Sequence, residues 1–324
     1  MGAQKALRGA HLARRGPGAR GLLRMAELDC ELQAAVSISC ADLADVYRQR
    51  WEALPPAQRE RVPKEPVGSD LANWLGQRWE NRLWADKAKL LREMYAEHVD
   101  PAMQDAEITY VGNPPMSETK YAELADKTDE LLVARQRGER TTCLVANATV
   151  RMPFGEETVY IQPDILVGLP GRPFAVGEVK VYLDRSSRTD PDELGRACFQ
   201  AAAGIAAIES TERRGTKVEA LSEAHIILRR GPWPSLRALD VSDEVATVHK
   251  LVAQVPARAE QLLRELAGRP LRGVGHRWTP LCASLCDLEP TCRPADTARH
   301  AIETARADLA ITDAEWAAAE SELG

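Results

Sequence analysis

The sequence predicts an α/β protein in which helices pack around a mixed central sheet. Up to about residue 140, apolar residues recur mostly at the three- and four-residue spacing of helices. Between residues 142 and 183 the spacing changes, and segments rich in Val, Ile, Tyr and Phe are separated by turn residues, which is typical of strands. A helical pattern then returns. We therefore expect a helical N-terminal region, an αβ core and a helical C-terminal end.

Composition and charge restrict the possible functions. The 324 residues are 44% hydrophobic, which allows a sizeable core. The net charge of −6 argues against a protein that coats nucleic acid non-specifically, although a nuclease can carry its basic surface locally. No apolar run approaches the roughly 18 residues needed to span a bilayer. Seven cysteines without an export signal favour a reducing compartment, so we expect a cytoplasmic protein without a membrane partner.

The first 24 residues differ from the rest of the chain. They are rich in Ala, Arg and Gly, contain no acidic residue and lack the apolar stretch of a secretory signal. A transit peptide would have this composition, and so would an extension from an upstream start codon. We favour the extension, because a more ordinary sequence begins at Met25. Either origin predicts a poorly ordered tail.

Helices are predicted before the first strand. Residues 71–99 have apolar side chains at helical spacing, and Ser69 and Asp70 are candidate N-caps. A proline-containing break follows, and a second helix is predicted over residues 118–137. We assign residues 25–140 to a helical region that contributes to the core.

Strands dominate the next part of the chain. We expect three of them, over residues 142–152, 158–167 and 174–183. The turn at residues 169–173 predicts that the last two strands are antiparallel neighbours.

The later elements alternate in type. Asp190 can cap a helix that runs to about residue 209, a strand is expected over residues 224–228, and a helix over residues 242–267. This places the αβ core at residues 141–267. The remainder, residues 268–324, is predicted to be a cysteine-rich loop followed by C-terminal helices.

Three ionisable residues stand on the predicted central strands. Asp164 follows Pro163, and Glu178 and Lys180 are two residues apart, so they share one face of their strand. Such groups are costly in a core unless something pairs them, and carboxylates are the ligands that hard divalent cations prefer. The lysine could then orient or deprotonate a water that attacks a phosphate. The alternative is a solvated strand face with a cross-strand ion pair.

Two helices could add to this site. Arg196 and Gln200 are four residues apart, and their face of the helix could contact a substrate backbone or simply face solvent. Glu80 lies one turn after Gly76 on the tryptophan-rich helix. It could approach the same metal from the side, or it could be a surface glutamate.

A cysteine cluster lies near the C-terminal end. Three thiols fall within eleven positions, at Cys282, Cys286 and Cys292. This spacing is typical of a metal or iron–sulfur site, although incidental cysteines are the alternative. The candidates for a fourth ligand are Cys40, Cys30, Cys143 and His276. Of these, His276 would complete a local zinc site, and we favour Cys40 because it lies near the first structured helix.

Together these residues resemble the PD-(D/E)xK nuclease superfamily. More narrowly, they resemble RecB-like exonucleases with an iron–sulfur cluster, such as the CRISPR-associated RecB-like exonucleases and the AddB nuclease domain. The resemblance covers roughly residues 40–292. It implies a restriction-endonuclease-like αβα core, a 4Fe–4S cluster, and Mg²⁺- or Mn²⁺-dependent cleavage of DNA, often at single strands or ends.

The resemblance also implies roles for individual residues. The metal ligands would be Asp164 and Glu178 with Glu80 as the upstream acid, Lys180 would be the catalytic lysine, and Gln200 the glutamine of a Gln-x-x-x-Tyr motif. The cluster ligands would be Cys40, Cys282, Cys286 and Cys292. The basic residues predicted to contact DNA are Arg185, Arg188 and Arg196.

The sequence departs from the family pattern at three places. The motif tyrosine is Gly204, the upstream residue is Glu80 where RecB-like members commonly have His, and the first cysteine gap has three residues where two are usual. A second hypothesis is therefore a non-catalytic, zinc-stapled module that binds nucleic acid or protein. A hydrolase of small phosphoesters is disfavoured, since no Gly-rich phosphate loop lies beside the acids.

Overall fold

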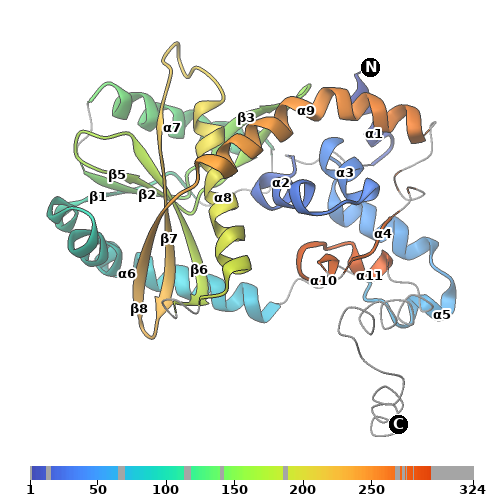
Figure 1. Ribbon diagram of the computed structural model, residues 1–324, viewed down its shortest axis with the longest axis horizontal. Helices are drawn as coiled ribbons and strands as arrows, with labels where there is room; N and C mark the ends of the chain where they lie inside the picture. The colour runs from blue at the N-terminus through green and yellow to red at the C-terminus, as the bar shows by residue number, and fades with distance from the viewer. Residues whose placement is uncertain are drawn as a thin grey trace, which may run out of the picture.

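The fold is built around a six-stranded mixed sheet (Figure 1). The computed structural model describes residues 2–11, 16–64, 70–112, 118–138, 142–184, 189–266, 271, 274, 276–279 and 281–292. The helices are α1 Ala3–Arg8, α2 Gly18–Glu27, α3 Glu31–Ile38, α4 Leu43–Ala53, α5 Pro56–Arg59, α6 Asp70–His98, α7 Glu118–Gln136, α8 Pro191–Glu209, α9 Ser242–Leu266, α10 Cys282–Leu285 and α11 Glu289–Cys292, with a 3₁₀ helix η1 at Pro101–Asp105. The strands are β1 Glu107–Tyr110, β2 Cys143–Ala146, β3 Val150–Phe154, β4 Glu157–Ile161, β5 Ile165–Gly168, β6 Phe174–Leu183, β7 Ala220–Arg230 and β8 Trp233–Asp240.

The sheet has the strand order β1-β2-β5-β6-β7-β8. The pairs β1–β2 and β6–β7 are parallel, and the other neighbours are antiparallel. This confirms the predicted α/β class and the mixed sheet. It also confirms that the two strands around the turn at residues 169–173 are antiparallel neighbours.

The three strands predicted before residue 184 are in fact five. The first is interrupted at Asn147, which has a positive φ of 56°, and the second is interrupted at Pro163, which has no N–H to donate to a sheet. Between these breaks, β3 and β4 leave the main sheet as a separate antiparallel pair. The edge strands β1 and β8 were not predicted: β1 is only four residues long, and β8 contains Pro234 and mixes polar with apolar residues.

Helices cover both faces of the sheet. One face, with Val176 and Ile226, packs in a core with residues of α7, α8 and α9. The other face, with Val179 and Ile227, packs against α6 and η1. Side chains two residues apart on a strand point to the same face, so Glu178 lies on the same face as Val176 and Lys180. This is the face that α8 covers.

Small side chains bring α8 close to the sheet. A Cβ at Gly204 would lie 3.0 Å from Cγ1 of Val176 and 3.2 Å from Cγ of Pro163. Gly204 is thus a packing contact behind the Pro163-Asp164 break. The predicted cap of α8 is confirmed, since the Asp190 side chain accepts hydrogen bonds from the N–H groups of Asp192 and Glu193.

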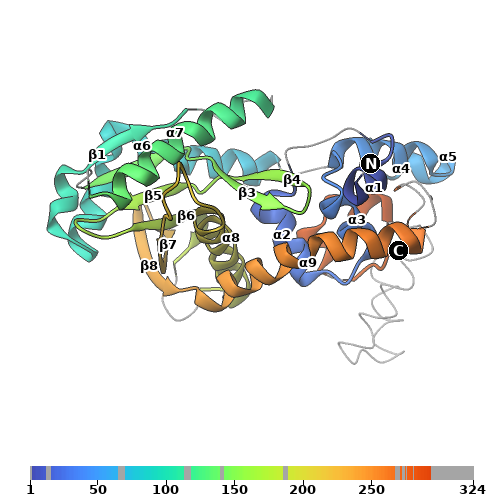
Figure 2. The same cartoon turned by 90° about the horizontal axis from the view of Figure 1, so that it is seen from above.

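Residues 2–11 and 16–24 belong to the fold, so the prediction of a poorly ordered tail is wrong for these residues. They form α1 and the first part of α2. Leu22 and Leu23 are buried, and Nε2 of Gln4 donates to the carbonyls of Ile38 at 2.8 Å and Phe154 at 3.0 Å. Figure 2 shows α1–α5 grouped beside the sheet, with α9 and the β3–β4 pair extending toward them.

One hydrophobic core crosses the predicted region boundaries. It contains buried residues from Leu7 to Cys292, including members of α2, α3, α8 and α9. The helix predicted over residues 71–99 is α6, although Ala85, Asp86, Lys87 and Ala88 have non-helical backbone angles. Within the described ranges no helix is both long and apolar enough to cross a membrane.

Candidate active site

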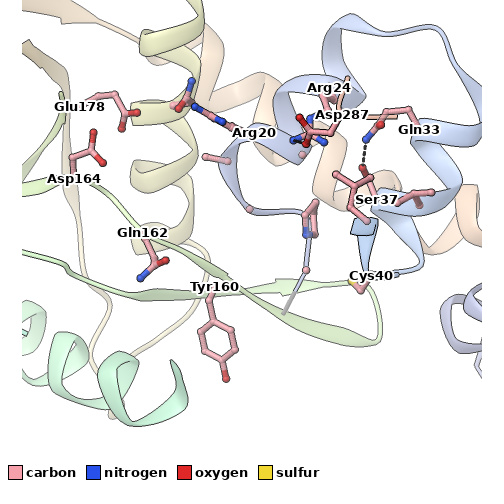
Figure 3. A pocket seen from close by; sticks show the side chains of 18 of the residues that line it. Arg20, Arg24, Gln33, Ser37, Cys40, Tyr160, Gln162, Asp164, Glu178 and Asp287 are labelled. Atoms are coloured by element: carbon pink, nitrogen blue, oxygen red, sulfur yellow. Dashed lines mark hydrogen bonds and ion pairs between the residues drawn. The ribbon is translucent and has the colours of Figure 1, made fainter. Parts of the chain in front are cut away.

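A cavity of about 420 Å³ lies between the sheet and the N-terminal helices α2 and α3 (Figure 3). Residues that the sequence singled out for catalysis line it from three elements and one connection: Glu80 on α6, Asp164 between β4 and β5, Glu178 and Lys180 on β6, and Gln200 on α8. The structure therefore brings all five predicted residues to one place. Gly76 plays no part in this, because a Cβ there would meet nothing within 4 Å.

The backbone break at Pro163 aims Asp164 into the cavity. Oδ2 of Asp164 accepts a hydrogen bond from the Val179 N–H at 2.8 Å, which ties the start of β5 to β6 beside Glu178. Figure 3 shows the carboxylates of Asp164 and Glu178 next to each other on one side of the cavity. Tyr160 and Gln162 also line it, as expected for residues that share a strand face with Asp164.

Lys180 connects α8 to the side of the cavity that carries Glu80, Asp164 and Glu178, which we call the acidic wall. Its Nζ donates a hydrogen bond to Oε1 of Glu178 and another, at 3.2 Å, to Oε1 of Gln200. The Glu178 and Lys180 side chains are only 7% and 15% exposed. The pair is therefore largely removed from bulk water, where its charges interact more strongly than at the surface.

Burial dominates the electrostatics of the carboxylates. Burial, with the nearby charge of Asp164 adding to it, raises the pKa of Glu178 to about 7 and the pKa of Glu80 to about 7. Burial also raises the pKa of Asp164, against the opposing effects of Lys180, the Val179 N–H and Arg20. When all three acids ionise, the single positive charge of Lys180 does not neutralise them. This side of the cavity then carries surplus negative charge.

This donor set fits a hard divalent cation. Oxygen ligands from Asp164, Glu178 and Glu80 are of the type that Mg²⁺ and Mn²⁺ prefer, and a cation would offset their mutual repulsion. Within the described part of the chain, no three His, Cys, Asp or Glu side chains are already arranged around a common ion position. Glu178 instead points its carboxylate to Lys180.

The opposite wall of the cavity was not predicted. It is formed by α2 and α3 and includes Arg20, Arg24 and Gln33. Nη2 of Arg24 forms an ion pair with Oδ2 of Asp287 at 3.1 Å. A signal was present in the sequence, because Arg20 and Arg24 are four residues apart around an apolar Leu22-Leu23 pair, which is the spacing of an amphipathic helix.

A second, much smaller cavity of about 10 Å³ is lined by cysteines. Its lining includes Cys30, Cys282, Cys286, Cys292 and His276. Cys40, the predicted fourth cluster ligand, does not line it and instead lines the acidic cavity. Because Cys30 precedes α3 and Cys40 follows it, the eight-residue helix separates them by about 12 Å. Cys143, on β2, is also absent from this lining.

Burial keeps two thiols of the cysteine pocket protonated at neutral pH. Burial raises the pKa of Cys286 to about 12 and the pKa of Cys292 to about 11. Nη2 of Arg50 donates to Sγ of Cys292 at 3.6 Å, and this cation works in the opposite direction on the pKa. Four thiols line this one small space, and thiolates are the ligands of zinc and iron–sulfur centres, whose positive charge would stabilise them. In the described residues, however, no three of these thiols already surround a common ion position.

The three arginines that the sequence predicted to contact DNA do not line the cavity in the described structure. Arg185 and Arg188 lie outside the described residues. Arg196 lies on α8, one turn before Gln200, but it is not part of the cavity lining. The basic side chains that do line the cavity are Lys180, Arg20 and Arg24.

Comparison with known proteins adds little to this geometry. No protein-family model matches the chain, and no curated protein matches it. Solved structures with some likeness include the crystal structure of SSO0001, at 13% identity and a TM-score of 0.20, over 58% of this chain and 87% of that chain. A likeness this weak carries no argument about function.

Proposed function

We propose that this protein is a metal-dependent DNA nuclease of the PD-(D/E)xK superfamily, with a restriction-endonuclease-like core and a RecB-like active site. One observation carries the proposal: Asp164, Glu178 and Lys180 line a single cavity together with Gln200 and Glu80. They come from α6, the connection before β5, strand β6 and helix α8, so a single solvated strand face with a local ion pair does not account for all five meeting.

Each residue has a role in hydrolysis of a phosphodiester. Asp164 and Glu178 would hold Mg²⁺ or Mn²⁺, with Glu80 assisting from α6. When bound, the cation would stabilise charge on the phosphate oxygens. Lys180 would orient the attacking water and either take up its proton or stabilise the negative charge that develops on its oxygen. Gln200 holds the lysine Nζ through the 3.2 Å hydrogen bond. The Val179 N–H fixes the position of Asp164.

The size of the cavity favours single strands or ends as substrate. A volume of about 420 Å³ falls in the range of roughly 300–1,000 Å³ that is typical of sites for compact ligands. Such a space suits a short segment of one strand between the carboxylates and α2.

The cysteine pocket is proposed to hold a structural 4Fe–4S cluster, with Zn²⁺ as the alternative. Its ligands would be Cys30, Cys282, Cys286 and Cys292, since these four thiols share the small cavity. A brown protein with broad visible absorbance supports the cluster. A colourless protein with one zinc supports the alternative, in which His276 competes as a ligand.

The nuclease assignment is tested with the variant Lys180→Ala. Purified protein is incubated with labelled single- and double-stranded DNA, with and without Mg²⁺ or Mn²⁺. We expect the wild type to cleave single strands or ends only with the ion, and Lys180→Ala to lose activity by about 10³-fold, within the usual range for a general acid–base group.

The matched control is Lys89→Ala, which removes an exposed lysine of α6. It should cleave like the wild type. Full activity in Lys180→Ala, or no cleavage of any DNA by the wild type, would reject the assignment.

A further inference from the structure

Arg20 occupies a distinctive position in the active-site cavity. It lies on α2, on the wall that faces the acidic residues, and Figure 3 shows its side chain extending from this helix toward the side that holds Asp164 and Glu178. Arg20 is exposed, and among the described residues it forms no ion pair or hydrogen bond. Its charge nevertheless acts on Asp164 through space.

Arg24, one turn further along α2, is in a different situation. Its guanidinium is buried and is neutralised by Asp287 at 3.1 Å. The helix itself is held by Leu22 and Leu23, which are buried in the main core. The scaffold of Arg20 is therefore fixed, while its own guanidinium has no direct hydrogen-bond or ion-pair partner among the described residues.

The balance of charges in the cavity leaves Arg20 without an anionic partner of its own. With the proposed divalent cation bound, the ionised carboxylates of Glu80, Asp164 and Glu178 would carry three negative charges, and Lys180 together with the cation would carry three positive ones. The acidic wall is then neutral. Arg20 remains as a surplus positive charge with its donors directed into the cavity, and a phosphodiester group supplies the one negative charge that would pair with it.

We propose that Arg20 is a substrate-positioning residue that binds a backbone phosphate of single-stranded DNA as the strand crosses between α2 and the carboxylates. This inference rests on the proposed nuclease function. Arginine suits the role because its planar guanidinium can contact two phosphate oxygens at once. It also assigns a function to the segment around α2, which the sequence alone suggested was a tail.

The test measures binding, separately from cleavage. The affinity of full-length protein for a fluorescent phosphorothioate single strand, which keeps its charge and resists hydrolysis, is measured by anisotropy in Mg²⁺ over a series of salt concentrations. We expect Arg20→Gln to weaken binding about tenfold and to reduce the slope of log K against log salt by about 0.7, the value for one lost single-strand phosphate contact. Arg20→Lys should keep the wild-type slope.

Arg264→Gln is the matched control, because Arg264 is an exposed arginine on α9 outside the cavity. It should bind like the wild type. If Arg20→Gln matches Arg264→Gln in both affinity and salt slope while the wild type binds and cleaves DNA, this proposal is wrong and the nuclease assignment stands. If the wild type neither binds nor cleaves DNA, both are wrong. Thermal denaturation, expected to be unchanged in Arg20→Gln, separates loss of contact from loss of fold.

Discussion

The acidic cavity and the cysteine pocket share a wall but differ in almost every physical property. The acidic cavity measures about 420 Å³ and is lined by carboxylates, arginines and amides, whereas the cysteine pocket measures about 10 Å³. The first has room for a substrate. The second is about the size of one water molecule, so its thiols would have to move apart to surround a cluster. This difference is consistent with the proposal that turnover takes place in the acidic cavity and that the cysteine pocket supports the fold.

The two sites are also physically connected. Gln33 of α3 lines both, and its Oε1 accepts a hydrogen bond from Sγ of Cys286 at 3.4 Å. Asp287, next to Cys286, forms the ion pair with Arg24 on the wall of the acidic cavity. If the cysteine pocket holds the proposed metal, its loss should therefore disturb the α2 and α3 side of the acidic cavity while leaving β6 unaffected.

The largest effect that separates the two sites is expected from one pair of cysteine variants. Cys30→Ala should lose the bound metal or cluster and lower the melting temperature, because coordination by buried thiolates contributes directly to folding. Cys40→Ala should keep a full complement of metal, since Cys40 lies outside the cysteine pocket. Metal analysis and visible absorbance measure both. Metal loss in Cys40→Ala, with retention in Cys30→Ala, would reverse the assignment.

A packing variant tests how α8 supports the acidic cavity. Gly204→Val places methyl groups where even a Cβ would be 3.0 Å from Val176 and 3.2 Å from Pro163. Overpacking of this kind costs about 1–3 kcal/mol, so the free energy of unfolding in urea should fall by that amount. Gly195→Val on the same helix is the control, because nothing lies within 4 Å of a Cβ there. Equal stability losses in the two variants would argue against a close contact at Gly204.

A smaller effect is expected when the lysine loses its partner on α8. Gln200→Ala removes the hydrogen bond to Nζ of Lys180. A hydrogen bond to a charged group contributes about 1.5–3 kcal/mol, which predicts a fall in kcat of about 10- to 100-fold with metal affinity unchanged. Steady-state cleavage assays and Mn²⁺ titrations measure the two quantities. An unchanged kcat would remove Gln200 from the active site.

The smallest effect concerns pH. Burial raises the pKa of Glu178 and the pKa of Glu80 to about 7 in the metal-free protein, well above the ordinary glutamate value. A carboxylate must lose its proton before it binds a cation, so Mn²⁺ affinity should rise as pH increases toward 7 and level off above it. Titrations between pH 6 and 8 measure this. Glu178→Gln should bind Mn²⁺ more weakly and show a shallower pH dependence, and an affinity independent of pH in the wild type would contradict the raised pKa values.

The sequence predicted the acidic wall well because strand alternation is local. Glu178 and Lys180 share a face whatever the rest of the fold does, and the helix with Gln200 follows directly. The positions of α2, with Arg20 and Arg24, and of the fourth cysteine depend on tertiary contacts between segments more than 100 residues apart. The local pattern predicts the α2 helix but not where it packs. The break at Pro163 was visible as a proline, but its consequence, a hairpin that leaves the sheet, depends on a second break at Asn147.

The proposed active site requires one cation position between the carboxylates of Asp164 and Glu178. Anomalous diffraction from crystals soaked in Mn²⁺ tests this position most directly. A single strong anomalous peak within coordination distance of both Asp164 and Glu178, absent in Glu178→Gln, is the predicted result. A peak elsewhere, or density in which Glu178 stays paired with Lys180 and no ion binds, would contradict it.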